Sequence, residues 1–439
     1  MPRDLRKNLC RKRDPVQLQS CYAKRHERSI SAGSLMRVIA YGLFGFISLA
    51  GAHVSSASTS DLNTKLTEVV AEGSKTHATK GVVIAIVTPS GLTAIAADGI
   101  RREGSPDRIL TTDRMHLGSC TKAFTALLVA TLVADGTLRW NSTIREIFDQ
   151  HVATSPNGAN PNGIMPGATP RTDPSPIDVG WDAVTLEDFL RHRGGATTEA
   201  PKEAWAAACA CRESPGVCRA EFVQSLLAKP PLHTRGKHAY SNQGYAIVGR
   251  LCEVATGMPY ESLLATRVLA PLGITQFGFG VPTQSLAESP SGHSATGAVN
   301  DVDNPPAIAP AGTLHMPLTE WAKFIAFELG GPVPAALQRA SIELSRAHSA
   351  PNMPEREAMG WFVVDRPWGG RVLTHSGSNT VWYCTAWLAP EKDFAVLAAT
   401  NQGGDAAARG CDYLCSRMIQ ICATDLHQEK APVTEPPAE

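Results

Sequence analysis

Hydrophobic residues follow two different spacings along this chain. Residues 81–87 are almost continuously apolar, residues 92–97 are apolar apart from one threonine, and a Pro-Ser-Gly turn separates the two. Four later segments also alternate or run apolar between turns, namely 360–364, 371–375, 381–388 and 394–400. Short runs of this kind, bounded by turn residues, are typical of antiparallel strands joined in hairpins.

The middle of the chain has the spacing of helices. Phe124, Leu127, Leu128 and Leu132 recur at intervals of three and four residues, which predicts the buried face of a helix that ends near Gly136. Further helices are predicted at 61–71, 184–192, 220–227, 245–255, 318–329 and 406–421. Residues 152–180 and 277–311 are rich in Pro, Gly and small polar residues, so we expect long loops there.

Strands at both ends and helices between them predict the fold class. The simplest arrangement is α/β plus all-α: one antiparallel sheet built from both chain ends and flanked by helices, with an inserted helical domain. We place the discontinuous α/β domain at 58–110 and 355–424, and the mainly helical domain with its long loops at 111–354. The proline-containing residues 425–439 are expected to form a disordered tail.

The first 57 residues differ in kind from the rest. Residues 1–37 are rich in Arg and Lys, and residues 38–52 form an uncharged, mostly apolar run that is short for a membrane-spanning helix. A small-residue site ending at Ala57 follows, which predicts a cleaved signal peptide and an exported protein, periplasmic or secreted. Translation from Met36 would give a signal of ordinary length. The alternative is an uncleaved membrane anchor.

Composition narrows the classes of function. Hydrophobic residues make up 43% of the chain, which is normal for a globular protein, and the formal net charge of zero gives no general attraction to nucleic acid or to anionic membranes. Of the eleven cysteines, those at Cys211 and Cys218 are suitably spaced for a disulfide in an oxidising compartment, although the connectivity stays open. Cys120 is expected to pack inside. The cysteine spacing resembles no zinc motif.

One stretch combines a nucleophile with a base. Ser119 and Lys122 stand three residues apart at the start of a predicted helix, directly after Gly118. This spacing places both side chains on one face, and the helix amino terminus adds unpaired N–H groups and a positive dipole end. A serine that attacks a carbonyl needs a nearby base and a place for the developing oxyanion. The pair alone is weak evidence, because both residue types are common.

Two distant segments supply further polar side chains. Tyr240 and Asn242 flank Ser241, so that in an extended segment they point the same way. His375 and Gly377 belong to a His-Ser-Gly-Ser sequence that leads into the strand predicted at 381–388. A glycine on an edge strand lets a substrate backbone approach closely.

Together these stretches resemble the three motifs of the penicillin-recognising serine hydrolases. The motifs are Ser119-Cys-Thr-Lys122, Tyr240-Ser-Asn242 and His375-Ser-Gly377, in this order and each more than a hundred residues from the next. The Tyr-x-Asn form resembles the branch that contains class C β-lactamases, DD-peptidases, D-aminopeptidases and related esterases. The resemblance covers about residues 61–422, and it implies the β-lactamase/transpeptidase-like fold.

The resemblance also implies a role for each residue. Ser119 would be the nucleophile that forms an acyl-enzyme, and Lys122 and Tyr240 would share its proton, in an order that stays open. Asn242 would hold the amide carbonyl of the substrate. The backbone N–H groups of Ser119 and Ser378 would form the oxyanion hole.

His375 stands in place of the lysine of the Lys-Thr-Gly form. It would hydrogen-bond Tyr240 or meet a substrate carboxylate, and an unperturbed histidine would do so mostly uncharged at neutral pH. That weakens the case for an efficient β-lactamase, and His-x-Gly forms are more like those of peptidases and esterases. Together with Gly377 and Ser378, His375 is assigned to substrate binding.

Each of these residues also has a purely structural interpretation. Ser119 could cap a helix, Lys122 could lie at the surface, Tyr240 could be a packed aromatic side chain, and His375 could bond only to the backbone. Other residues are expected to be structural or solvated, namely His192, His293 and His315, and three tryptophans are expected in the core or on the sheet face, namely Trp361, Trp382 and Trp387.

We therefore predict an exported serine hydrolase that works without metal or cofactor. Its substrate would be an amide or ester: first a D-amino peptide, then a small ester, then a β-lactam. The predicted partner is a small molecule or a peptide, including fragments of peptidoglycan; nucleic acid is not expected, and a membrane only if the signal segment stays uncleaved. The competing class is a penicillin-binding sensor or peptidoglycan-binding module with little or no turnover.

Overall fold

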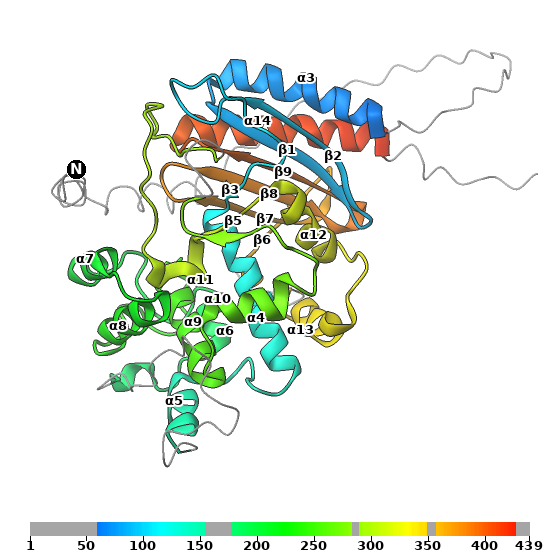
Figure 1. Cartoon of the computed structure of the whole chain (residues 1–439). Coiled ribbons are helices and arrows are strands. Elements are labelled where there is room, and N and C mark those ends of the chain that lie inside the picture. The colour runs from blue at the N-terminus through cyan, green and yellow to red at the C-terminus, as the bar shows by residue number, and fades with distance from the viewer. Residues whose placement is uncertain (1–58, 154–176, 283–288, 349–356, 427–439) are drawn as a thin grey trace, which may run out of the picture.

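The computed structural model describes residues 59–153, 177–282, 289–348 and 357–426 (Figure 1). The predicted leader and signal peptide, nearly all of the predicted tail and parts of both long loops lie outside these residues. Among the helices that are described, none combines the length and the hydrophobicity that crossing a bilayer requires.

A six-stranded antiparallel sheet joins the two ends of the chain, in the order β2-β1-β9-β8-β7-β6. Its strands are β1 (Gly81–Thr88), β2 (Gly91–Gly99), β6 (Phe362–Arg366), β7 (Gly370–Ser378), β8 (Tyr383–Ala389) and β9 (Phe394–Thr400). β1 pairs with β9, so the first and last strands are neighbours inside the sheet. The predicted sheet from both chain ends is confirmed, whereas the domain boundaries remain a prediction.

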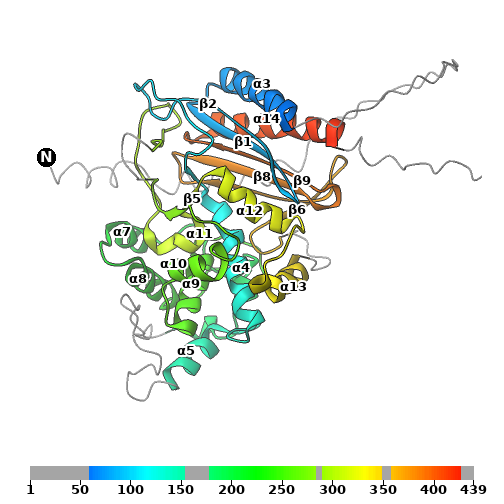
Figure 2. The ribbon, with the colours of Figure 1, turned by 45° about the vertical axis from the view of Figure 1, so that its right-hand side comes forward.

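Helices cover both faces of the sheet. α3 (Thr59–His77) and α14 (Asp405–Ile421) lie side by side on one face (Figures 1 and 2). Alternate residues of β1 pack toward this layer, namely Val82, Ile84 and Ile86, and the residues between them pack toward the helical body, namely Val83, Ala85 and Val87. Because both faces are buried, the strand reads as a continuous apolar run.

The helical body lies on the other face of the sheet (Figure 2). It contains α4 (Thr121–Ala134), α5 (Ile144–Ala153), α6 (Leu186–Leu190), α7 (Lys202–Ala210), α8 (Pro215–Leu227), α9 (Asn242–Thr256), α10 (Tyr260–Leu264), α11 (Ala309–Gly312), α12 (Leu318–Glu328) and α13 (Gln338–His348). Every residue of α4 from Thr121 to Leu132 is buried. We predicted that only one face of this helix would be buried, but burial extends around all of its faces over these residues.

Two local features differ from the expectations. Ser241 caps α9 by accepting a hydrogen bond from the Gly244 N–H, so this helix begins at Asn242, three residues earlier than predicted. A small sheet of β3 (Met115–His116), β5 (Leu314–Met316) and β4 (Gly278–Phe279), in the order β3-β5-β4, was not predicted. It ties the segment just before Ser119 to a distant part of the chain.

The cysteine and tryptophan predictions are confirmed. A disulfide joins Cys211 and Cys218, and Cys120 is buried as a free thiol. Trp361 and Trp382 are buried in the core, and Trp387 is a half-buried residue that packs beside Trp368 on the sheet.

Candidate active site

The candidate site lies where α4 begins and β7 ends. Ser119 is the middle residue of a short 3₁₀ turn, η1 (Gly118–Cys120), that leads into α4. β6 pairs with β7 only as far as Thr374, so residues 375–378 extend beyond that neighbour. Here η1 packs against β7 and brings the first and third sequence motifs together.

Two glycines permit this close packing. A Cβ on Gly377 would lie 1.9 Å from the Leu117 carbonyl oxygen, and a Cβ on Gly118 would lie 2.3 Å from the Ser378 nitrogen. Gly118 also has a positive φ of 47°, which L residues with side chains rarely adopt. The glycine at 377 is thus required by the protein's own backbone, and not only by an approaching substrate.

Gly377→Ala is expected to push η1 away from β7. Because the collision is with backbone, we expect the free energy of unfolding to fall by about 1–3 kcal/mol and acylation of Ser119 to slow. Urea unfolding and labelling by a fluorophosphonate measure the two effects. Gly244→Ala is the matched control, since its Cβ would meet only ordinary contacts at 3.4 Å and beyond. Equal stability and labelling rate in the two variants would contradict this account of Gly377.

Lys122 is buried at the centre of the site. Its Nζ lies 3.1 Å from Ser119 Oγ, 2.7 Å from Asn242 Oδ1 and 2.8 Å from the Ala311 carbonyl oxygen. Burial lowers the pKa of Lys122 to about 7. The lysine is therefore no surface residue, and its neutral form is accessible near neutral pH.

Tyr240 lies beside Lys122, with the ammonium nitrogen 4.8 Å from the ring centroid. Burial raises the pKa of Tyr240, and the neighbouring Ser119 hydroxyl offsets only part of this effect. Tyr240 and Asn242 do not share one extended segment as we expected. Ser241 is extended, Asn242 is already the first residue of α9, and the helix start turns the amide toward Lys122.

His375 is buried beside Tyr240, with 6.2 Å between the ring centroids. Its Nδ1 lies 2.7 Å from the Ser376 carbonyl oxygen, which can only accept, so Nδ1 carries the proton. In the neutral ring Nε2 is then an acceptor. The backbone contact that we considered as the structural alternative is present, but it does not remove His375 from the site.

A second polar network lies behind the turn that carries Ser119. The Gly118 N–H donates to His116 Nδ1 at 3.1 Å, and His116 Nε2 lies 3.1 Å from Asp303 Oδ1. Asn379 donates to the same oxygen of Asp303 at 2.9 Å, directly after Ser378. This network links the two segments that carry the Ser119 and Ser378 N–H groups. Sequence reasoning missed it, because its residues come from three distant segments without a shared motif.

The three histidines expected to be structural behave differently. His293 bonds through Nδ1 to the Asn401 carbonyl oxygen, and His315 is buried with its pKa lowered by burial to about 3, so both are structural. His192 instead packs against the ring of Tyr240, with 4.4 Å between the ring centroids. Its partner, Glu357, was not among the residues that we predicted from the sequence.

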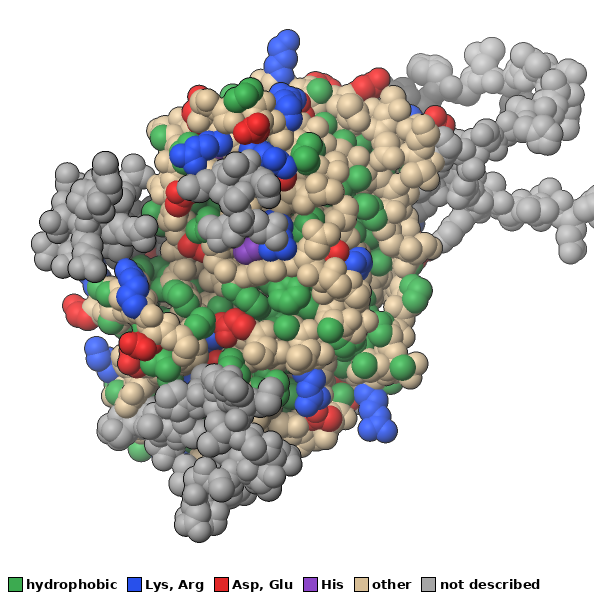
Figure 3. Space-filling model, viewed as in Figure 1, with side chains coloured by type: hydrophobic (Ala, Val, Ile, Leu, Met, Phe, Trp, Pro, Cys, Tyr) green, Lys and Arg blue, Asp and Glu red, His purple; other side chains and the backbone are tan. Residues whose placement is uncertain are grey.

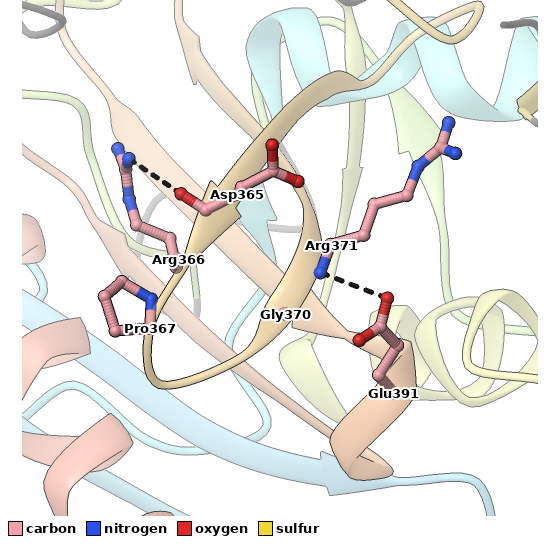
Figure 4. A pocket seen from close by; sticks show the side chains of 6 residues that line it. All are labelled: Asp365, Arg366, Pro367, Gly370, Arg371 and Glu391. Atoms are coloured by element: carbon pink, nitrogen blue, oxygen red, sulfur yellow. Dashed lines mark hydrogen bonds between the residues drawn. The ribbon is translucent and has the colours of Figure 1, made fainter.

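The molecular surface has another hollow, which lies apart from these residues. It is lined by Asp365, Arg366, Pro367, Gly370, Arg371 and Glu391, at the end of β7 away from Ser378 (Figure 4). Its polar groups are partly paired with each other, as in the 3.2 Å bond from the Arg371 N–H to Glu391. On the face in Figure 3, hydrophobic side chains gather across the middle, between the sheet and the helical body.

Comparisons with known proteins identify the family of this chain. The Beta-lactamase family model matches residues 66–414. Protein flp of Staphylococcus aureus (strain N315) is 21% identical over 313 residues, which are 70% of this chain and 57% of that protein. Penicillin-binding protein 4 of Amycolatopsis lactamdurans is 23% identical over 383 residues, which are 82% of this chain and 90% of that protein. The chain thus spans little more than half the length of Protein flp.

Solved structures show the same fold. The β-lactamase from Sulfitobacter sp. EE-36 superposes with a TM-score of 0.65 at 17% identity, over 85% of this chain and 100% of that one. The D-alanine carboxypeptidase AmpC from Burkholderia cenocepacia gives 0.62 at 16% identity, over 82% and 99%. The predicted β-lactamase/transpeptidase-like fold class is confirmed. Since the family model matches most of the chain, the protein belongs to the Beta-lactamase family.

Proposed function

We propose that this enzyme hydrolyses an amide or ester through an acyl-enzyme on Ser119, with Lys122 as the first base. The observation that carries the proposal is the set of three contacts of Lys122 Nζ. A neutral amine has two N–H donors and one lone pair. The donors suit Asn242 Oδ1 and the Ala311 carbonyl oxygen, and the lone pair is then left for the Ser119 hydroxyl proton.

The pKa directions support this order of proton transfer. With the pKa of Lys122 at about 7, about half of the lysine is neutral at pH 7. The raised pKa of Tyr240 keeps the phenol protonated at the same pH. Lys122 would therefore take the proton from Ser119, and Tyr240 would give its phenolic proton to the leaving group while Lys122 passes the serine proton on to Tyr240.

The remaining site residues would bind the substrate. The Ser119 and Ser378 N–H groups would hold the oxyanion, which their close packing through Gly118 and Gly377 favours. Because Asn242 turns its amide oxygen to Lys122, its Nδ2 would donate to the substrate's amide carbonyl.

His375 guides the choice among substrates. Its neutral form offers an acceptor at Nε2 and no fixed positive charge for the carboxylate of a β-lactam. This favours a D-amino peptide or a small ester over a β-lactam. We also propose that the protein is exported, on the signal-like residues 38–57.

Labelling with a fluorophosphonate or a fluorescent penicillin, followed by intact mass, tests this proposal. We expect one adduct on Ser119, and turnover of a p-nitrophenyl ester or a D-Ala-D-Ala peptide faster than turnover of nitrocefin. An unlabelled wild-type protein would contradict the nucleophile. A penicillin adduct that persists without turnover of any substrate would instead support the sensor.

A further inference from the structure

A buried carboxylate lies behind the candidate site and takes no part in the mechanism above. Glu357 is 5% exposed, and its two carboxylate oxygens face two histidines. Oε2 lies 2.6 Å from His238 Nε2, and Oε1 lies 3.1 Å from His192 Nε2. Such a charge is costly to bury unless it is paired, so its place needs an explanation.

The tautomer of His192 is set by its other neighbour. The Ser241 N–H donates to His192 Nδ1 at 3.0 Å, so Nδ1 is the acceptor and the ring proton sits on Nε2, facing Glu357. Burial lowers the pKa of His192, which keeps the ring neutral. Burial alone would raise the pKa of Glu357, but its contacts with His192 and His238 more than offset this effect and lower that pKa. The carboxylate is therefore charged at neutral pH.

The backbone of Glu357 is anchored on the helix that carries the base. Glu357 opens a tight turn in which Met359 and Gly360 both have positive φ. A Cβ on Gly360 would lie 2.6 Å from the Ala123 nitrogen and 2.8 Å from the Lys122 carbonyl carbon, so the turn packs directly on α4. One short segment thus contacts both the start of α4 and the histidines behind Tyr240.

We propose that Glu357 is a positioning residue for the Ser119–Lys122–Tyr240 site, which holds His192 against the Tyr240 ring and places a negative charge behind Lys122. The inference rests on the proposed function. The His192 ring lies between the Ser241 N–H, which donates to its Nδ1, and Glu357 Oε1, which is 3.1 Å from its Nε2, and the ring centroid is 4.4 Å from that of Tyr240. The phenol is thereby held toward Ser119 and Lys122.

The charge of Glu357 also acts on Lys122 and Tyr240. Several titratable or charged groups surround it: Lys122 from α4, Arg191 and His192 after α6, His238 and Tyr240 before α9, Tyr245 within α9, and His375 from β7, beside Tyr240. The carboxylate stabilises the cationic form of Lys122 and opposes ionisation of Tyr240. It therefore limits how far burial lowers the pKa of Lys122, and it keeps the phenol protonated.

Glu357→Gln tests the inference through the pH dependence of fluorophosphonate labelling. Glutamine keeps the shape but loses the charge, and its amide nitrogen can no longer accept from one of the two histidines. We expect labelling at pH 8 to slow by about 10- to 100-fold because Tyr240 is misplaced. The midpoint of the acid limb should move down by about half a pH unit or more, because neutral Lys122 is no longer disfavoured. Glu320→Gln removes another buried carboxylate and should leave the midpoint unchanged.

His192→Asn separates positioning from charge. Residue 192 has a φ of 55°, which asparagine tolerates, and the asparagine oxygen can still accept from the Ser241 N–H. This variant loses the ring against Tyr240 but keeps the carboxylate, so labelling should slow without a downward shift of the midpoint. It also serves if Glu357→Gln does not fold.

Three outcomes decide the matter. The inference is supported if Glu357→Gln is labelled more slowly and its midpoint is lowered, and if His192→Asn is labelled more slowly and its midpoint is not lowered. A folded Glu357→Gln with the wild-type midpoint, or a His192→Asn variant with the wild-type rate, overturns it. A wild-type protein that is not labelled on Ser119 at any pH overturns the proposed function instead, so the two failures are distinguishable.

Discussion

Replacing Ser119 with alanine is expected to abolish covalent labelling and to lower turnover on the order of 10³- to 10⁶-fold. The reason is that Ser119 is the hydroxyl that Lys122 Nζ reaches, at 3.1 Å, and alanine leaves the base without a nucleophile to activate. The fold should survive, because the Ser119 side chain is half-buried and has no large packing role. Intact mass after labelling and steady-state ester hydrolysis measure both effects.

Cys120→Ala is the matched control for this loss. The Cys120 thiol is the neighbouring nucleophile, but it is buried and burial raises its pKa, so it stays protonated. We expect Cys120→Ala to keep the label. If Ser119→Ala still carried the adduct and Cys120→Ala did not, the cysteine would be the nucleophile and the assignment of Ser119 would be wrong.

Replacing Lys122 with methionine is expected to slow acylation by about 10²- to 10⁴-fold, as removal of a general base does. In the wild type the rate should rise with pH through a midpoint near 7, because only neutral Lys122 can take the proton. The variant should lose this acid limb. Rates of fluorophosphonate labelling between pH 5 and pH 9 give both the loss and the shape of the profile.

Stability gives a second readout of Lys122. Its pKa is lower in the folded protein than in the unfolded chain, so between about pH 7 and pH 10 the unfolded chain binds more protons and the free energy of unfolding rises with pH. Lys122→Met should remove this rise.

Lys323→Met is the control for the labelling profile. At this partly exposed lysine, which is paired with Glu320, the substitution should keep the acid limb. If the pH profile of the labelling rate were unchanged in Lys122→Met, Tyr240 would be the base.

Local patterns account for the part of the site that could be predicted. Ser119 and Lys122 lie within one helical turn, and Tyr240 and Asn242 are separated by a single residue, so short spacings already bring each pair together. The strands were predictable because each alternates or runs apolar over a few residues. By contrast, Glu357 is 119 residues from His238 in the sequence, and nothing near either residue indicates the contact.

The sequence by itself determined the fold class and predicted the nucleophile and the set of motif residues, because hydrophobic periodicity and motif spacing are properties of neighbouring positions. Only the tertiary structure decided the charge state of that set. Burial of Lys122, a residue of α4, against α9 moves its pKa toward neutrality, and burial also keeps Tyr240 protonated. The structure also decided that His192 and Glu357 stand behind the site. Desolvation and charge pairing depend on which distant segments surround a side chain, and no local pattern records that.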